Sequence, residues 1–225
     1  MRPVAVVTGA SRGIGRAIAL RLAKTHDIFA VARTKSLLDE LAAEVRDADA
    51  ECRVAAVDLR DPAAIARALS GVDAQVLVNN AGLGPTKPLL ELTPDEWQAM
   101  VDVNFSALYH VTRALLPGMV SRRRGHVVII GSISGRSAFI GGSCYAATKA
   151  AANSFAESLM LEVRHEGVKV SVVNPGSVAT EFSPRSDSSW MLSAEEVADA
   201  VARLIDTPSD VLVHRLEIRA LAPKK

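Results

Sequence analysis

The sequence predicts an α/β fold, in which about seven parallel strands form a doubly wound sheet with helices on both faces. Short β-branched apolar runs recur along the 225 residues, and amphipathic stretches with helical spacing lie between them. Strands that are apolar throughout are buried on both faces, and strict alternation with helices gives parallel pairing through right-handed crossovers. No linker, low-complexity tract or repeat divides the chain, so we expect one domain over residues 1–225.

The first half of the chain supplies strands and helices in turn. Strands are expected at residues 4–7, 28–31, 54–57 and 76–78. Helices are expected at residues 14–24, at residues 36–46 and from Asp61 onward. Pro62 follows Asp61, and this order suits a helix start, because the first helical position leaves its N–H unpaired in any case.

The second half continues the alternation. Strands are expected at residues 127–130, 168–173 and 211–218, and helices at residues 143–166 and 193–205. A further long helix opens at Thr93-Pro94-Asp95-Glu96, which has the form of a capping box. The serine-rich stretch 181–190 contains Pro184 and is expected to be a mobile loop, so residues 181–192 are expected to form a short lid.

Charge and cysteine content exclude several classes of protein. The formal net charge is +1, so no basic field favours nucleic acid or an anionic membrane as partner. Cys52 and Cys144 show no metal-ligand or C-x-x-C spacing, so we expect neither a disulfide framework nor a metal site. No apolar stretch approaches the roughly 20 residues that cross a bilayer, and no signal-peptide pattern is present. We expect a cytoplasmic protein with a small-molecule partner.

Three glycines lie between the first strand and the first helix. The segment Thr8-Gly9-Ala10-Ser11-Arg12-Gly13-Ile14-Gly15 has the spacing G-x3-G-x-G. Missing side chains let the backbone approach a pyrophosphate, and the helix start offers free N–H groups and a positive dipole end. An ordinary turn with packing glycines is the alternative, because a lone glycine motif is weak evidence. The strand–turn–helix context favours dinucleotide binding.

The end of the second strand bears on the choice between NAD and NADP. An acidic side chain there would accept a hydrogen bond from a free ribose 2′-OH and would repel a 2′-phosphate. This chain has Ala32-Arg33-Thr34 instead, and Arg33 can donate charge-assisted hydrogen bonds to a phosphate. Arg12 is a second candidate for the same phosphate. A solvated loop residue is the alternative for Arg33, but the pattern favours NADP(H).

Tyr145 and Lys149 are four residues apart in an expected helix, so their side chains share one face. The pKa of a free tyrosine is about 10, too high for an efficient acid at pH 7. A cationic neighbour stabilises the phenolate and is expected to lower that pKa, as is the positive charge of an oxidised nicotinamide ring. Taken alone, the pair would favour the alternative of a chance pair on a surface helix.

Two further polar residues, Ser132 and Asn104, are candidates for the same site. Ser132 follows the fifth expected strand, at the carboxyl edge where open α/β sheets bind ligands. Its hydroxyl can bind a substrate oxygen alongside Tyr145, and Ser134 is the competing candidate by chemistry. Asn104 lies within an expected helix, where an amide is a mediocre helix former. A buried, helix-bending asparagine is therefore the alternative to a functional one.

Together these features resemble the short-chain dehydrogenase/reductase family, in its single-domain branch with a short C-terminal lid. The residues that carry the resemblance are Thr8 to Gly15, Asn79-Asn80-Ala81-Gly82, Asn104, Ser132, Tyr145-x3-Lys149 and Pro175-Gly176. They occur in the family's order and at its spacing, over residues 1 to about 180. The resemblance implies a Rossmann fold, hydride transfer between a nicotinamide and a carbonyl or alcohol, and assembly as a homodimer or homotetramer.

The resemblance also implies roles for individual residues. It favours Ser132 over Ser134, and it implies that Asn104 holds a water in a proton relay with Lys149. It implies that Asp58 accepts from the adenine amino group, with a turn residue as the alternative. The expected cofactor-binding residues are Gly9, Ser11, Arg12, Gly13, Ile14, Gly15, Arg33, Asp58, Leu59, Asn80, Ala81, Gly82, Tyr145, Lys149, Pro175, Gly176, Val178 and Thr180.

The expected substrate-facing residues are mostly apolar, which favours a partly hydrophobic ketone, β-ketoacyl or hydroxy-acid substrate. They are Ile133, Ser134, Phe139, Ile140, Cys144, Ser177, Phe182 and Trp190. After Thr180 the chain departs from the family's commonest pattern and looks like the shorter subgroup that includes hydroxy-acid and serine dehydrogenases. A non-catalytic dinucleotide-binding sensor or scaffold is the alternative function, although such proteins typically lose the tyrosine or the lysine.

Overall fold

The sheet has seven strands in the part of the chain that the computed structural model describes, which is residues 2–84, 86–182 and 189–221. The strands are β1 Val4–Thr8, β2 Asp27–Ala32, β3 Cys52–Ala56, β4 Ala74–Asn79, β5 Gly125–Ile130, β6 Val168–Pro175 and β7 Arg215–Ile218. All neighbouring strands are parallel, in the order β3-β2-β1-β4-β5-β6-β7. The predicted doubly wound sheet is confirmed.

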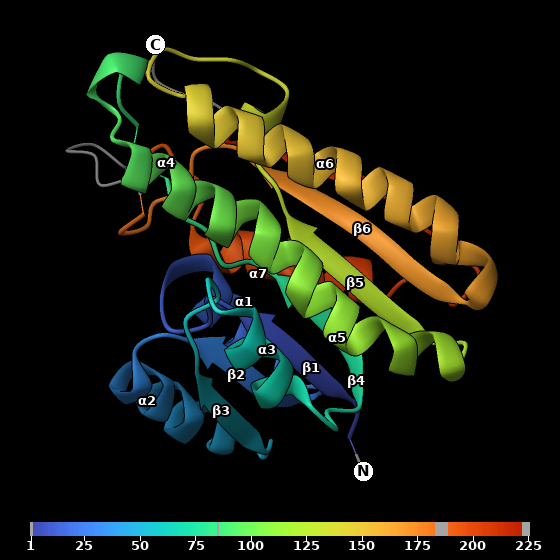
Figure 1. Ribbon diagram of the computed structural model, residues 1–225. Coiled ribbons are helices and arrows are strands. Elements are labelled where there is room, and N and C mark those ends of the chain that lie inside the picture. Colours follow the sequence, from blue (N-terminus) through green and yellow to red (C-terminus); the bar gives the residue numbers. More distant parts are fainter. Residues whose placement is uncertain (1, 85, 183–188, 222–225) are drawn as a thin grey trace.

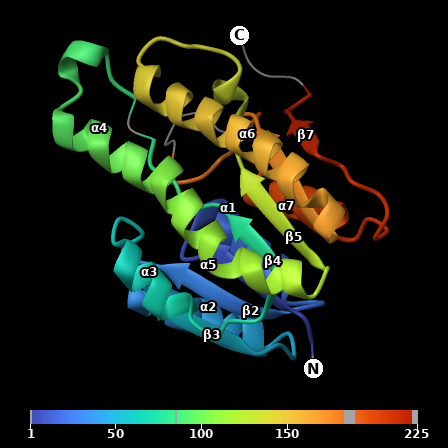
Figure 2. The same cartoon turned by 45° about the vertical axis from the view of Figure 1, so that its right-hand side comes forward.

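Helices cover both faces of this sheet (Figures 1 and 2). The α-helices are α1 Gly13–Leu22, α2 Lys35–Arg46, α3 Pro62–Leu69, α4 Pro94–Val101, α5 Ala107–Ser121, α6 Ser143–Val163 and α7 Ala194–Ile205. Short helical segments are η1 Leu89–Glu91, η2 Asp102–Ser106, η3 Ile133–Gly135 and η4 Arg164–Glu166. One core cluster joins α1, α2 and α7 to the sheet, and a second joins α3, α5 and α6 to the opposite face.

The apolar strand runs are explained by these two layers. In β1, Val6 belongs to the cluster with α3, α5 and α6, while Ala5 and Val7 belong to the cluster with α1, α2 and α7. Successive side chains of a strand point to opposite faces. Since both faces are covered, most positions are apolar and buried polar ones such as His126 and Ser171 are hydrogen-bonded, which removes the polar alternation of a one-sided sheet.

Most element boundaries follow the predicted ones, and three features differ: the middle of the helix that opens at Thr93, the end of α6 and the start of β7. The capping box at Thr93 is confirmed, because Thr93 Oγ1 accepts from the Glu96 N–H at 3.2 Å and Glu96 Oε2 accepts from the Thr93 N–H at 3.0 Å. The helix that follows is interrupted by the π-helical turn η2 between α4 and α5. The α6 helix ends at Val163, three residues early, and β7 starts four residues later than expected.

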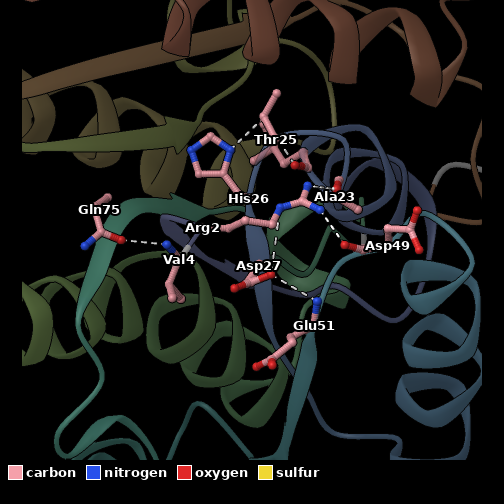
Figure 3. Close-up of polar contacts among 10 residues, drawn as sticks. Arg2, Val4, Ala23, Thr25, His26, Asp27, Asp49, Glu51 and Gln75 are labelled. Atoms are coloured by element: carbon pink, nitrogen blue, oxygen red, sulfur yellow. Dashed lines mark hydrogen bonds and ion pairs between the residues drawn. The ribbon is translucent and has the colours of Figure 1, made fainter.

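Side chains tie the loops together at the amino edge of the sheet (Figure 3). Arg2 donates to the carbonyl oxygens of Ala23 and Asp49. Gln75 Oε1 accepts from the Val4 N–H at 2.6 Å, and an Asp27 carboxylate oxygen accepts from the Glu51 N–H at 3.0 Å. These bonds satisfy backbone groups that the sheet leaves unpaired at its margin. None of the helices within the described ranges is long and apolar enough to cross a membrane.

His126 in β5 is a buried titratable group inside the sheet. Its Nε2 lies 2.8 Å from Ser171 Oγ, which in turn donates to the Val213 carbonyl oxygen. Burial lowers the pKa of His126 to about 3, whereas an unfolded histidine has a pKa of about 6.5. The unfolded chain therefore binds one more proton than the folded chain between these two values. This difference makes stability fall as pH falls through that window.

We expect the free energy of unfolding to lose up to about 1.4 kcal/mol per pH unit through this residue between pH 6 and pH 4. In His126→Gln an amide donates to Ser171 without titrating, so its stability should fall less steeply over the same window. Urea unfolding at several pH values measures the slopes, with exposed His165→Gln as the matched control. Equal slopes in wild type and His126→Gln would show that His126 does not titrate in this way.

Candidate active site

A cleft of about 1220 Å³ lies at the carboxyl ends of the strands. Its walls are the segments that follow β1, β2, β3, β4, β5 and β6. The chain order reverses beside β1, which has β2 on one side and β4 on the other. Ligands of open α/β sheets bind in the crevice at such a switch point. The cleft is therefore where this topology places a binding site.

The glycine loop forms one wall of the cleft. Gly9 has φ +66°, and a Cβ on it would lie 2.9 Å from the Ala81 Cα, so a side chain there would both strain the backbone and collide. Thr8 Oγ1 accepts from the N–H groups of Asn80 at 3.0 Å and Ala81 at 3.1 Å. The loops after β1 and β4 are thereby fastened together. Gly15 is absent from the residues that line the cleft.

Gly15 packs within this junction instead of facing the cleft. A Cβ on Gly15 would overlap the Gly9 carbonyl oxygen and the Asn80 amide nitrogen. Its missing side chain allows α1 to approach the loop after β4. The expectation that it contacts a cofactor directly is therefore corrected to a packing role. The other expected cofactor residues all line the cleft: Gly9, Ser11, Arg12, Gly13, Ile14, Arg33, Asp58, Leu59, Asn80, Ala81, Gly82, Tyr145, Lys149, Pro175, Gly176, Val178 and Thr180.

The two candidate phosphate-binding arginines differ in their surroundings. Arg33 follows β2, is exposed and lines the cleft. Arg12 caps α1 and forms an ion pair with Glu181 at 2.5 Å. Both partners of that pair are well exposed, so it stabilises the fold little. A phosphate at Arg12 would have to compete with the Glu181 carboxylate, whereas Arg33 makes no ion pair among the residues with described positions.

Ser132 is held in place by its backbone and its side chain. Its N–H donates to Asn174 Oδ1 at 2.9 Å, and its Oγ accepts from the Ser134 N–H at 3.1 Å. Asn174 is fully buried at the end of β6. Because Ser132 Oγ accepts from a backbone N–H, the hydroxyl proton can be donated elsewhere. Ser134 also lines the cleft, and its N–H serves to orient Ser132.

Tyr145 and Lys149 lie one turn apart near the start of α6 and both line the cleft. Lys149 Nζ lies 5.9 Å from the centre of the Tyr145 ring and donates to the Ile130 carbonyl oxygen at 2.9 Å. Only 6% of Lys149 is exposed, and burial lowers its pKa to about 8. The predicted meeting of these two side chains is confirmed in position.

The prediction that Lys149 lowers the pKa of Tyr145 is wrong for this structure, whereas the effect of an oxidised nicotinamide ring stays a prediction. Burial raises the pKa of Tyr145, and the hydrogen bond with the Ser132 hydroxyl offsets only part of that rise. Burial disfavours the phenolate because charge is poorly solvated away from water. Lys149 Nζ donates to the Ile130 carbonyl oxygen, and among the described residues no hydrogen bond joins it to the Tyr145 hydroxyl. Tyr145 is therefore a protonated phenol at neutral pH.

Asn104 lies in the π-helical turn η2 and is 5% exposed. Its Oδ1 accepts from the Leu83 N–H at 2.7 Å, and its Nδ2 donates to the Leu83 carbonyl at 2.8 Å and to Thr148 Oγ1 at 3.0 Å. It does not line the large cleft. Instead it lines a small internal cavity of about 10 Å³ together with Lys149, a volume at the lower bound for one water.

Apolar side chains gather beside Tyr145. The Phe182 ring centre lies 6.0 Å from that of Tyr145, and a Cβ on Gly84 would overlap the Phe182 ring. Phe139 and Ile140 line the cleft and are exposed by 41% and 98%. Of the other expected substrate-facing residues, Ile133, Ser134 and Ser177 also line the cleft.

Two expected substrate-facing residues are placed elsewhere. Cys144 is buried, and its Sγ lies 3.8 Å from the Trp97 carbonyl oxygen, so it packs toward α4 because the next residue on the helix, Tyr145, takes the cleft-facing position. Trp190 does not line the cleft, but its neighbour Met191 does. Residues 183–188, half of the expected lid 181–192, lie outside the described residues.

Several cleft-lining residues were not singled out from the sequence. They are Ala32, Thr34, Val57, Leu83, Gly84, Thr86, Val103, Ile130, Gly131, Glu181 and Met191. Most stand within one or two positions of a predicted residue, at the end of a strand. They could have been predicted from their adjacency to the predicted residues, because all residues of a loop can line the cleft and not only the polar ones.

Comparisons with known proteins agree with this geometry. The sequence model of a family described as short chain dehydrogenase matches residues 3–189. The NADP-dependent 3-hydroxy acid dehydrogenase YdfG of Escherichia coli (strain K12) is 34% identical, over 96% of this chain and 94% of the relative. A serine dehydrogenase in a closed form complexed with NADP+ has a TM-score of 0.91 at 32% identity, over 99% of this chain and 96% of its own.

A third similar protein is a metagenomic short-chain oxidoreductase solved in complex with NADP. Its TM-score is 0.88 at 35% identity, and the match covers 98% of each chain. The family match itself includes the glycine loop as well as Ser132, Tyr145 and Lys149. The similarity therefore extends over both the binding loop and the polar groups of the cleft. The chain belongs to the short-chain dehydrogenase/reductase family of oxidoreductases.

Proposed function

We propose that this protein is an NADP(H)-dependent oxidoreductase that interconverts a carbonyl compound and its alcohol. The observation that carries the proposal is the convergence of two hydroxyls and a buried amine on one cleft. Ser132 follows β5, while Tyr145 and Lys149 lie on α6, and all three line that cleft. The relatives named as dehydrogenases support the same class of reaction.

The opposite end of the cleft fits the nucleotide. Gly9 and Gly13 carry no Cβ and have φ of +66° and +52°, so the wall beside them is backbone that an anion can approach. Arg33 offers an exposed cation, and no carboxylate stands at Ala32, Arg33 or Thr34. The printed names of the E. coli relative and of two solved structures include NADP. These observations support NADP(H) over NAD(H).

When bound, NADPH would supply hydride to the carbonyl carbon. The task of the chain is to hold and protonate the carbonyl oxygen. Ser132 Oγ, oriented by the Ser134 N–H, donates to that oxygen together with the Tyr145 hydroxyl. The raised pKa of Tyr145 keeps its proton in place until negative charge develops on the substrate oxygen. In the reverse direction Tyr145 would first pass its own proton to the relay, and its oxygen would then take the proton of the alcohol.

Lys149 and Asn104 would return the proton to Tyr145. The pKa of Lys149 is about 8, so the amine is a cation at neutral pH that can exchange its proton near physiological pH. Gly82 lies between the two side chains, since a Cβ there would be 3.4 Å from Asn104 Oδ1 and 3.7 Å from Lys149 Nζ. We propose that a water in their shared cavity completes the relay.

The substrate end favours a partly apolar carbonyl compound of ketone, β-ketoacyl or hydroxy-acid type. Phe139, Ile140, Phe182 and Met191 supply apolar surface close to the reacting hydroxyls. Burial of such surface contributes about 25 cal/mol per Å² to binding. A highly charged sugar would gain little from these side chains.

The exposed apolar residues on α5 and α6 support a homodimer or homotetramer. The exposed residues are Phe105 in η2 just before α5 (36% exposed), Tyr109 on α5 (46%) and Leu161 on α6 (53%). These two helices lie side by side on the outer layer in both views (Figures 1 and 2). A second copy would cover these side chains. Sedimentation velocity should show twice or four times the 23.8 kDa chain mass, and a sole 23.8 kDa species would contradict this.

Replacing Tyr145 with phenylalanine removes the acid and leaves the ring. We expect kcat for ketone reduction to fall by about 10³-fold, because no other hydroxyl can deliver the proton from that position. The Kd for NADPH, measured by fluorescence titration, should change less than twofold. The matched control is Tyr109→Phe, at an exposed tyrosine on α5. More than a tenth of wild-type kcat in Tyr145→Phe would refute the assignment.

Replacing Arg33 with alanine removes the proposed contact to the 2′-phosphate. We expect the Kd for NADPH to rise roughly tenfold or more, while the weak binding of NADH stays unchanged. Lys35→Ala is the control, since Lys35 is an exposed cation two residues away that pairs with Asp39. If wild type binds NADPH and NADH equally, the proposed preference for NADP(H) is wrong. If Arg33→Ala keeps the preference for NADPH, Arg33 is not the residue that sets it.

A further inference from the structure

The Asp58 carboxylate is hydrogen-bonded to Arg60 at the end of the cleft that Arg33 lines, which is the proposed nucleotide end. Arg60 Nε lies 3.1 Å from each carboxylate oxygen of Asp58, and Arg60 Nη2 lies 2.6 Å from Oδ2. The Arg60 backbone N–H also donates to Asp58 Oδ1, at 3.0 Å. A fork of this kind fixes a carboxylate in both position and orientation. The two residues stand in the connection between β3 and α3.

The carboxylate lies among groups that face the same end of the cleft as Arg33. Asp58 lines the cleft after β3, and Arg33 lines it after the neighbouring strand β2. The strand ends are in register, with Ala32 opposite Ala56. Arg60 holds the pKa of Asp58 down to about 2, with Arg33 as a weaker contributor. Asp58 is therefore an anion throughout the working pH range, and it lies within the electrostatic reach of Arg33.

An unneutralised carboxylate here would oppose the binding of a phosphate in two ways. It would repel the phosphate directly, and it would attract the guanidinium of Arg33 that the phosphate needs. Arg60 offsets the charge and donates hydrogen bonds to both carboxylate oxygens. Arg60 itself does not line the cleft, so it acts through Asp58.

We propose that Arg60 is a specificity-determining positioning residue, which neutralises Asp58 and thereby lets the cleft accept a 2′-phosphate beside Arg33. This inference rests on the proposed use of NADP(H). The side chains of Arg60 and Asp58 are 48% and 37% exposed, so water screens the charge and the effect is moderate. Loss of the Arg60 charge should weaken binding of a 2′-phosphate roughly five- to tenfold.

Adenosine 2′,5′-bisphosphate and adenosine 5′-monophosphate are the probes, because they differ only in the 2′-phosphate. Calorimetric titration gives the Kd of each for wild type, Arg60→Gln, Asp58→Asn and the double variant Asp58→Asn/Arg60→Gln. The control is Arg67→Gln, which removes one positive charge from α3, where Arg67 lies 4.0 Å from Asp61 and is 73% exposed.

Arg60→Gln should weaken the bisphosphate five- to tenfold and leave the monophosphate within twofold of wild type. In the double variant the ratio of the two Kd values should return to within about twofold of wild type, because the charge that Arg60 neutralised is gone as well. Loss of the predicted contact from Asp58 to the adenine amino group would weaken both probes alike and leave that ratio unchanged. Arg67→Gln should behave as wild type. The loss in Arg60→Gln should shrink in 0.5 M salt, since screening acts on exposed charges.

Two results would overturn the inference while leaving the cofactor choice standing. If wild type prefers the bisphosphate and Arg60→Gln binds it equally well, Arg60 has no part in the preference. If the double variant keeps the same loss of preference for the bisphosphate over the monophosphate as Arg60→Gln, Arg60 contacts the phosphate itself. If instead wild type shows no preference between the two probes, the proposed use of NADP(H) is what fails, and the inference fails with it.

Discussion

Parallel pairing of the strands is the constraint on which the site depends. It brings the carboxyl ends of all seven strands of the described chain to one edge, so that loops far apart in sequence meet there. The reversal of strand order at β1 opens a crevice at that edge. Ser132 and Tyr145 face this crevice from β5 and α6, and Arg33 faces it from the opposite side. The same strand order thus places the hydroxyl groups of Ser132 and Tyr145 and the guanidinium of Arg33 in one cleft.

Burial then sets the chemistry of the groups that the topology collects. Tyr145 keeps its proton because its phenolate would be poorly solvated, and Lys149 is brought within reach of exchange because its cation is poorly solvated as well. The Ile130 carbonyl compensates part of that cost for Lys149. At the nucleotide end the side chains are more exposed, so charge acts there with solvent screening. One cleft thereby combines buried hydroxyl and amine groups, which we propose transfer the proton, with a solvated end that we propose binds the phosphate.

The alternation of apolar runs and amphipathic stretches was sufficient to predict the sheet, because both faces of each strand must be apolar. Strand ends and a shared helix face brought the candidate catalytic residues Ser132, Tyr145 and Lys149 into view, but the family resemblance was needed to single them out. The orientation of side chains was less accessible. Gly15 packs against Asn80, which is distant in sequence, and Cys144 packs toward Trp97 because the adjacent Tyr145 takes the cleft-facing position. The effect of Lys149 on the pKa of Tyr145 was misjudged, because the direction of the shift depends on burial, and the spacing of residues in the sequence does not show how deeply Tyr145 is buried. Likewise, Asn104 in its π-helical turn is hydrogen-bonded to Leu83, 21 residues away, which the sequence pattern does not show.

The central claim is that this cleft directs hydride from a nicotinamide to a carbonyl carbon while Tyr145 protonates the oxygen. Deuterium transfer from [4-²H]NADPH, labelled separately on each face of the ring, measures this directly with a panel of ketones, aldehydes and β-keto esters. The account predicts that mass spectrometry finds one deuterium on the carbinol carbon of a product alcohol, from only one of the two labelled cofactors. Oxidation of NADPH without deuterium in any product, or no turnover across the panel, would contradict it.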